Sequence, residues 1–159
     1  MGDYIKEMRA LIGKRPLFNC GCGCLIFNEN GQVLLQKRSD DGLWCCPGGS
    51  MDLGETVFET TKREIREETG LEIDDLELFG LYSGKTQHNI YSNGDEVYSI
   101  TVIFKTANYK GEPRIDEESE ALQWFDIENI PSDIIGYFVP IKEDLVKMSE
   151  GKLDKMPIL

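Results

Sequence analysis

The sequence is short of positive charge, of histidine and of long apolar segments. Its 159 residues include 17 lysines and arginines against 29 aspartates and glutamates, a formal net charge of −12 at pH 7, and one histidine. So negative a chain should repel nucleic acid and anionic membranes, and we expect neither as a partner. No apolar run approaches the roughly 18 residues of a membrane span. An anionic substrate would need something other than the net field to hold it, and a divalent cation is the obvious candidate.

The N-terminal segment and the cysteines give no sign of export. From Met1 to Arg15 the chain lacks the uninterrupted apolar core of a signal peptide, and its five cysteines are an odd number. We therefore expect a reduced, cytoplasmic protein. Cys20, Cys22 and Cys24 alternate with glycines, so their thiols would share one face of a strand. That spacing fits small buried strand residues better than a zinc site, which usually begins with two cysteines about two to four residues apart.

No repeat, low-complexity tract or linker divides the chain, which predicts a single domain over residues 1–159. Apolar residues at helical spacing predict an extra N-terminal helix over about residues 3–14, ended by Pro16. Strands at Cys20–Phe27 and Gln32–Lys37 are expected to pair as a hairpin across the turn Asn28–Gly31. Further strands are predicted at Leu43–Cys46, Leu71–Leu81, Val97–Lys105 and Ala121–Phe125, and closing helices at Ile134–Phe138 and Ile141–Met148. Helices at both ends of several strands favour a mixed sheet between helices.

The clearest helix is predicted at Thr56–Thr69. Thr56 and Glu59 form a capping-box pattern at its start, and Gly70 stands where a left-handed C-terminal cap belongs. One stripe of this helix must pack on the sheet, and it comprises Phe58, Thr61, Ile65 and Thr69.

Three glutamates gather beside that stripe. Glu64, Glu67 and Glu68 stand at positions i, i+3 and i+4, where like charges cost a helix about 0.2–0.5 kcal/mol per pair. Arg63 can offset part of that cost, so a solvated, salt-bridged helix face is one interpretation. The other interpretation follows from the glycine-rich loop in front of the helix, because clustered carboxylates beside a rigid turn suit Mg²⁺ and its substrate phosphates. This second interpretation predicts metal-assisted phosphoryl chemistry.

The segment Gly49–Leu71 reads GSMDLGETVFETTKREIREETGL, which agrees at every specified position with the Nudix box, G-x₅-E-x₇-R-E-U-x-E-E-x-G-U, where U is apolar. From about Cys20 to Ile130 the chain resembles the Nudix hydrolases, among them 8-oxo-dGTP and ADP-ribose pyrophosphatases. The resemblance implies an α/β fold of the Nudix type, an α/β/α sandwich with a mixed β-sheet between helices. It also implies Mg²⁺ as the cofactor, with Mn²⁺ as a substitute. The implied reaction cleaves a nucleoside diphosphate linked to another group into a nucleoside monophosphate and a phosphorylated product.

The resemblance also implies roles for individual residues of the box. The implied metal ligands are three carboxylates and a backbone carbonyl, at Glu64, Glu67, Glu68 and Gly48. In 8-oxo-dGTP pyrophosphatases the position of Glu64 has also been proposed to activate water. Arg63 and Glu64 are expected to be catalytic residues. Arg63 also occupies, with Glu55, the positions of an ion pair that holds the loop against the helix in the family. Gly49 and Gly70 fall on structural positions of the box.

Two further site residues lie outside the box. Arg38 ends the second predicted strand, where related enzymes contact a substrate phosphate, and a plain surface arginine is the alternative. In the 8-oxo-dGTP pyrophosphatase pattern an acidic residue six positions before a strand tryptophan reaches the metals. Counting back from Trp124 gives Glu118, which we expect to be a metal ligand or catalytic base. A solvated acidic loop is the alternative there.

Several nucleotide substrates fit this motif. The proline that marks many ADP-ribose pyrophosphatases is absent, because no proline occurs from Leu71 to Glu112. A catalytically silent nucleotide-binding regulator is one alternative to a hydrolase, and an isomerase that depends on Cys45 or Cys46 is another. The intact box glutamates favour the hydrolase. The expected partner is a small-molecule nucleotide, and the apolar residues of the N-terminal helix favour a homodimer.

Overall fold

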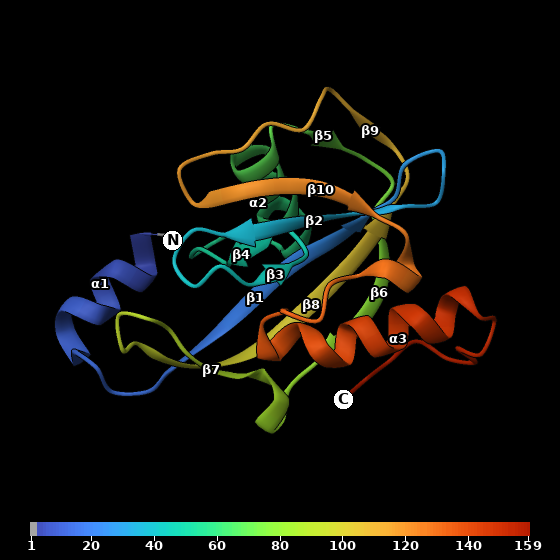
Figure 1. The fold of residues 1–159 in the computed structure, drawn as a ribbon. Helices are drawn as coiled ribbons and strands as arrows, with labels where there is room; N and C mark the ends of the chain where they lie inside the picture. The colour runs from blue at the N-terminus through green and yellow to red at the C-terminus, as the bar shows by residue number, and fades with distance from the viewer. Residues whose placement is uncertain (1–2) are drawn as a thin grey trace.

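The computed structural model describes residues 3–159 (Figure 1). Met1 and Gly2, which the predicted domain includes, lie outside the described residues. The α-helices are α1 (Asp3–Ile12), α2 (Val57–Thr69) and α3 (Val139–Ser149). The strands are β1 (Leu17–Ile26), β2 (Val33–Arg38), β3 (Trp44–Cys45), β4 (Gly48–Ser50), β5 (Glu72–Ile73), β6 (Glu77–Tyr82), β7 (His88–Ile90), β8 (Glu96–Thr106), β9 (Tyr109–Lys110) and β10 (Ser119–Phe125). Three short 3₁₀ helices are η1 (Gly84–Gln87), η2 (Ile127–Asn129) and η3 (Gly136–Phe138).

The larger sheet is mixed, as predicted, and contains β4, β1, β8, β6 and β7. β1 and β8 run parallel, whereas the other pairings are antiparallel. Successive side chains of β1 point to opposite faces, so that Leu25 joins a core with Ile141 of α3 and Cys24 joins a core with Ile65 of α2. Helices therefore cover both faces of the sheet (Figure 1), which confirms the α/β/α sandwich.

The predicted hairpin between Cys20–Phe27 and Gln32–Lys37 is wrong. The two segments form β1 and β2, but β2 pairs with β10 and β3 in a separate antiparallel sheet. Only a bridge between Phe27 and Val33 joins them beside the turn. Both edges of β1 are already paired, with β4 on one side and β8 on the other, so no edge remains for β2.

The predicted strand Leu71–Leu81 is divided in two. β5 ends at Ile73 and pairs with β9, whereas β6 begins at Glu77 and joins the mixed sheet. Between them Asp75 has a φ of 51°, a left-handed conformation that interrupts the extended run. No glycine or proline marks this break in the sequence.

Helix α2 has the predicted caps. The Thr56 hydroxyl accepts the N–H of Glu59, the Glu59 carboxylate accepts the N–H of Thr56, and Gly70 has a φ of 71°. The predicted packing stripe is buried at Thr61, Ile65 and Thr69. The prediction that Phe58 is buried with them is wrong, because its side chain is half exposed. Its ring still lies against the sheet, with its centroid 4.9 Å from that of Phe104.

Helix α1 is the predicted extra helix, although it ends at Ile12 rather than near residue 14. Ile5 is buried within the chain, whereas Leu11 is largely exposed.

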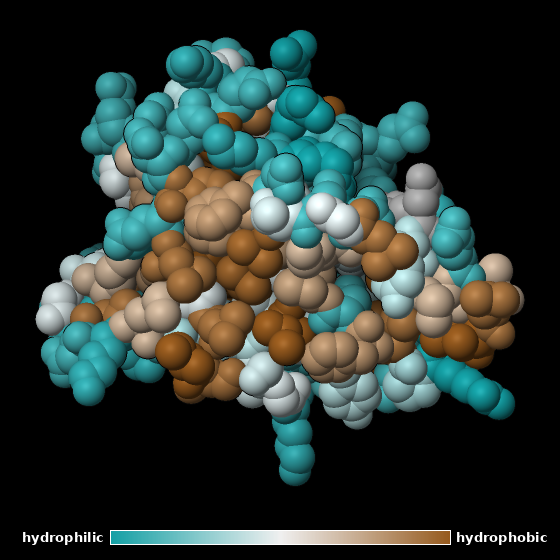
Figure 2. All heavy atoms as spheres, turned by 180° about the vertical axis from the view of Figure 1, so that it is seen from behind, coloured by the Kyte–Doolittle hydropathy of each residue, from teal (hydrophilic) through white to brown (hydrophobic). Residues whose placement is uncertain are grey.

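Apolar side chains gather on the face of the molecule opposite to that seen in Figure 1 (Figure 2). Phe18 and Tyr98, register partners on β1 and β8, are exposed apolar residues of the mixed sheet. In the part of the chain that the structure describes, no helix is long and apolar enough to cross a membrane.

Candidate active site

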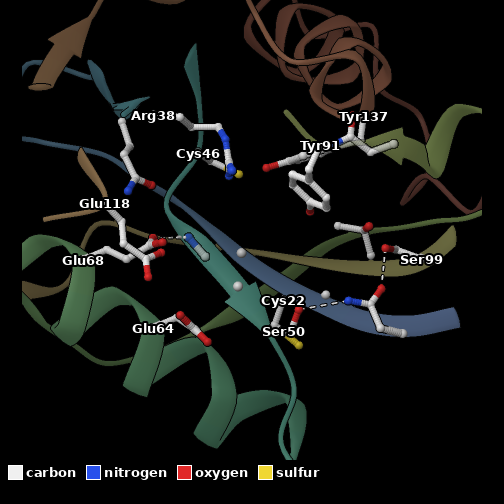
Figure 3. A pocket seen from close by; sticks show the side chains of 18 of the residues that line it. Cys22, Arg38, Cys46, Ser50, Glu64, Glu68, Tyr91, Ser99, Glu118 and Tyr137 are labelled. Carbon is white, nitrogen blue, oxygen red and sulfur yellow. Dashed lines mark hydrogen bonds between the residues drawn. The ribbon is translucent and has the colours of Figure 1, made fainter. Parts of the chain in front are cut away.

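A pocket of about 400 Å³ is lined by residues of β1, β2, β4, β8 and α2 and by the loop after β7. The residues predicted for the site that line it are Arg38, Gly48, Gly49, Glu64, Glu68 and Glu118. The three glutamates occupy one side of the pocket, and Tyr91, Tyr137 and Ser99 occupy the other (Figure 3). The pocket therefore has an acidic wall and a neutral wall.

Glu64 and Glu68 form the α2 part of the acidic wall. They are only 5% and 8% exposed, so the interpretation of a solvated helix face is wrong for both. The N–H of Gly48 donates to Glu68 Oε2 at 2.8 Å. Burial nevertheless raises the pKa of Glu68 to about 8 and raises the pKa of Glu64, because desolvation disfavours a charged carboxylate. A cation in the pocket would favour the charged form of both groups.

Gly49 makes room for the Glu64 carboxylate. A Cβ atom added at Gly49 would stand 2.5 Å from both Cδ and Oε2 of Glu64 and 2.7 Å from Oε1. Even the smallest side chain would therefore force that carboxylate to move. This close approach gives a physical reason for glycine at the first position of the box.

Arg63 is the centre of the ion pairs in the box. Its Nε lies 2.6 Å from Oε1 of Glu55 and its Nη2 lies 2.9 Å from Oε2, so the ion pair implied between these two residues is present. This pairing lowers the pKa of Glu55 to about 2. Nη1 of Arg63 donates to Glu64 at 2.7 Å and to Glu67 at 3.3 Å. The Glu67 side chain is 54% exposed, so Glu64 and Glu68 face the pocket whereas Glu67 faces Arg63 and solvent.

Glu118 lies in the loop just before β10 and lines the pocket, whereas Asp116, Glu117 and Glu120 are not among the lining residues. The N–H of Glu118 donates to Asp116 Oδ1 at 3.0 Å, which fixes the backbone of the loop. Glu120 pairs with Lys37 at 3.0 Å. Of the acids in this loop, Glu118 is the residue that borders the pocket, as the count back from Trp124 predicts.

Arg38 lines the same pocket, but acidic neighbours already hold it. Its Nε and Nη2 donate to the two carboxylate oxygens of Asp40 at 3.0 and 2.7 Å, and Asp41 lies 3.5 Å away. The guanidinium also stands over the ring of Tyr91, 5.5 Å from its centroid. Arg38 is therefore a fixed positive group between the acidic and neutral walls rather than a free surface side chain.

Comparison with known proteins agrees with this architecture. The profile of the NUDIX domain matches residues 19–145. The chain belongs to the Nudix family. The uncharacterized Nudix hydrolase YvcI of Bacillus subtilis is 33% identical over 107 residues, which cover 66% of this chain and 65% of YvcI. The nucleoside triphosphatase NudI of Escherichia coli is 31% identical over 122 residues, which cover 72% of this chain and 84% of NudI. The crystal structure of a MutT Nudix hydrolase from Burkholderia pseudomallei superposes with a TM-score of 0.68 at 29% identity, covering 80% of this chain and 97% of that one.

The donors in the Nudix pocket suit a hard divalent cation. Across residues 3–159, the His, Cys, Asp and Glu side chains form no group of three or more arranged to hold a metal ion. The pocket does hold carboxylate oxygens from two elements, Glu64 and Glu68 on α2 and Glu118 before β10. Oxygen donors of this kind are those that Mg²⁺ and Mn²⁺ take, with water or substrate phosphate completing the coordination. The chemistry of the donor set therefore fits the metal that the family implies.

Reasoning from the sequence missed the neutral wall of the pocket. Asn19, Ser50 and Ser99 form a hydrogen-bonded row, in which Asn19 Nδ2 donates to Ser50 Oγ at 2.9 Å and Ser99 Oγ donates to Asn19 Oδ1 at 2.5 Å. Tyr91 and Tyr137 also belong to this wall. These residues come from β1, β4, the turn before β8, β8 and η3, and no local spacing relates them.

Cys45 and Cys46 are both buried beside the pocket, and Cys46 lines it. Burial raises the pKa of Cys45 to about 12 and that of Cys46 well above the usual range for a thiol. Both side chains are therefore protonated at neutral pH and make poor nucleophiles. This environment does not favour the isomerase alternative, which needs a reactive thiol.

Proposed function

We propose that the protein is a Mg²⁺-dependent pyrophosphohydrolase, with Mn²⁺ as a substitute, that cleaves a nucleoside diphosphate linked to another group. The products are a nucleoside monophosphate and a phosphorylated compound. The observation that supports this most is that Glu64 and Glu68, buried on the box helix, share a pocket with Glu118 from another element. Membership of the Nudix family supports the same reaction class. The relative NudI, named a nucleoside triphosphatase, favours a nucleoside triphosphate among the candidate substrates, alongside ADP-ribose-like compounds.

In this proposal the carboxylates of Glu64, Glu68 and Glu118 hold the metal, together with the carbonyl of Gly48. Glu67 is included on the strength of the motif alone, because its side chain faces Arg63 and solvent. When bound, the divalent cation supplies positive charge that activates water and neutralises the phosphate groups. In the hydrolysis, the oxygen of a water molecule bonds to phosphorus and an anhydride P–O bond breaks. Glu64 or Glu118 accepts the proton that the water loses.

The proposal gives supporting roles to the two arginines. Arg63 holds Glu64 in place through its hydrogen bond and is itself held by Glu55. Arg38 borders the pocket with a guanidinium that suits phosphate oxygens, so we assign it to a substrate phosphate. To make that contact, Arg38 would exchange part of its pairing with Asp40 for the phosphate.

The purified protein is expected to release a nucleoside monophosphate from at least one nucleotide when Mg²⁺ is present and to stop when the metal is chelated. The measurement is product analysis across (d)NTPs, 8-oxo-dGTP, ADP-ribose, NADH, nucleotide sugars and dinucleoside polyphosphates, with Mg²⁺, Mn²⁺ or chelator. Turnover that is unaffected by chelation would contradict the metal-dependent mechanism. Tight binding of one nucleotide without turnover would instead identify a catalytically silent regulator.

We also propose that the protein forms a homodimer. Leu11 of α1 and the sheet residues Phe18 and Tyr98 are exposed apolar groups that an interface would cover. Light scattering at micromolar concentration is expected to give twice the chain mass of 18.0 kDa. A mass of 18.0 kDa would show that these residues remain exposed in a monomer.

A further inference from the structure

Helix α1 lies outside the part of the chain that the NUDIX profile matches, which begins at residue 19. In the fold it stands beside the turn between β7 and β8 (Figure 1). This turn, residues 91–95, carries part of the neutral wall of the pocket. The helix and the active site are thus connected through one short segment.

Arg9 and Lys14 make that connection. Nη2 of Arg9 donates to the carbonyl of Glu96 at 2.7 Å, and its Nε lies 3.5 Å from Oδ2 of Asp95. Nζ of Lys14 donates to the carbonyl of Asn93 at 2.7 Å and to Oδ1 of Asp95 at 3.0 Å. Two basic side chains, one on α1 and one just after its end, therefore converge on one carboxylate of the turn.

The contact is partly buried, and the turn is internally ordered. Asp95 is buried, and the Arg9 side chain is only 12% exposed. The N–H of Tyr91 donates to the carbonyl of Asp95 at 2.9 Å, and Asn93 Nδ2 donates to Asp95 Oδ2 at 3.1 Å. Removing one partner of such a pair leaves a poorly solvated charge, so the turn and the helix are held together. Asp95 thus joins the helix to the turn through its carboxylate, and its backbone carbonyl joins the two ends of the turn to each other.

The turn presents three successive residues to the pocket, Tyr91, Ser92 and Asn93. The amide of Asn93 is bonded to Asp95 within the turn, whereas Tyr91 offers an aromatic ring and Ser92 a hydroxyl group, both of them uncharged. Such groups suit the sugar and base of a nucleotide, which stack and form hydrogen bonds, rather than its phosphates. The carboxylates and Arg38 supply the charged groups that phosphates and a cation need.

We propose that α1 and the residues just after it are a positioning element of the active site: Arg9 and Lys14 fix the 91–95 turn so that Tyr91 and Ser92 contact the nucleoside part of the substrate. This inference rests on the proposed function, since it assumes a nucleotide in the pocket. Arg9 and Lys14 themselves touch no substrate. They act through Asp95 and the backbone of the turn.

The test compares Arg9→Ala and Lys14→Ala with Arg15→Ala, which removes an equal charge from an adjacent exposed position. Calorimetric titration measures the binding of the four deoxynucleoside monophosphates and, separately, of inorganic pyrophosphate. The expected result is that Arg9→Ala weakens binding of the preferred monophosphate by about tenfold and Lys14→Ala by a few-fold, while pyrophosphate binding stays unchanged. Tyr91→Leu is expected to weaken the same monophosphate. Arg15→Ala should behave as the wild type.

If the wild-type protein is active, Arg9→Ala and Lys14→Ala should raise KM for the nucleotide with little change in kcat. Equal weakening of monophosphate binding and pyrophosphate binding would reveal a general loss of structure and overturn the inference. Unchanged monophosphate binding in Lys14→Ala and Tyr91→Leu would also overturn it. So would a wild-type protein that binds none of the monophosphates. A protein that hydrolyses nothing yet shows the expected binding pattern would contradict the proposed function and leave this inference standing.

Discussion

Replacement of Glu68 by glutamine is expected to lower kcat by about a thousandfold, which corresponds to about 4 kcal/mol of lost transition-state stabilisation. Glutamine keeps an oxygen that can accept the N–H of Gly48, but it cannot supply the negative charge proposed to hold the cation. Because burial raises the pKa of Glu68 from 4.5 to about 8, the metal-free fold loses stability as the pH rises through that range, and a glutamine, which does not ionise, avoids this loss. The variant should therefore melt at an unchanged or slightly higher temperature. Steady-state kinetics with Mg²⁺ and thermal melting without it are the two measurements.

Two substitutions, one in the loop before β10 and one at the start of β10, serve as companions to this experiment. Glu118→Gln should lower kcat far more than KM, as expected for a group that acts chiefly in the transition state. Glu120→Gln is the matched control, because it removes an equal charge and breaks only the ion pair with Lys37. Equal effects of the two would place the active-site acid elsewhere in this loop. A large drop in the melting temperature of metal-free Glu68→Gln would identify Glu68 as a structural partner of Gly48 rather than a ligand.

Gly49→Ala is expected to lower kcat/KM by about a hundredfold, since a misplacement of about 1 Å in an active site can cost that much. The added methyl group would stand 2.5 Å from the Glu64 carboxylate, which must then leave its position. The displaced atoms are the end of a flexible side chain rather than backbone, so the fold should survive. Kinetics at saturating Mg²⁺ and the melting temperature together separate lost activity from lost stability.

Gly136→Ala is the control for this substitution. A Cβ atom at Gly136 meets nothing within 4 Å, and its backbone is not in a left-handed conformation. It should leave both rate and melting temperature near those of the wild type. Wild-type activity in Gly49→Ala would mean that the position of Glu64 seen here is not required for turnover.

The box itself could be predicted from sequence because its interactions are local. The caps at Thr56 and Gly70 depend on residues within one helical turn, and the spacing of Glu64 and Glu68 follows from helix geometry. The ion pair between Glu55 and Arg63 spans eight residues of a continuous loop and helix. The α/β/α class followed from the resemblance, and the Nudix family match confirms it.

The strand pairing, the burial of the glutamates and the long-range contacts were decided only by the tertiary structure. A strand pattern shows which residues extend but not which edge is free, so β2 was wrongly paired with β1 instead of β10. Burial was equally undetermined, because helix spacing gathers three glutamates but only packing against the sheet buries Glu64 and Glu68 and leaves Glu67 exposed. The neutral wall and the contact of Arg9 with Asp95 join segments far apart in sequence. Such contacts depend on how the whole chain closes into layers, which no local pattern of residues encodes.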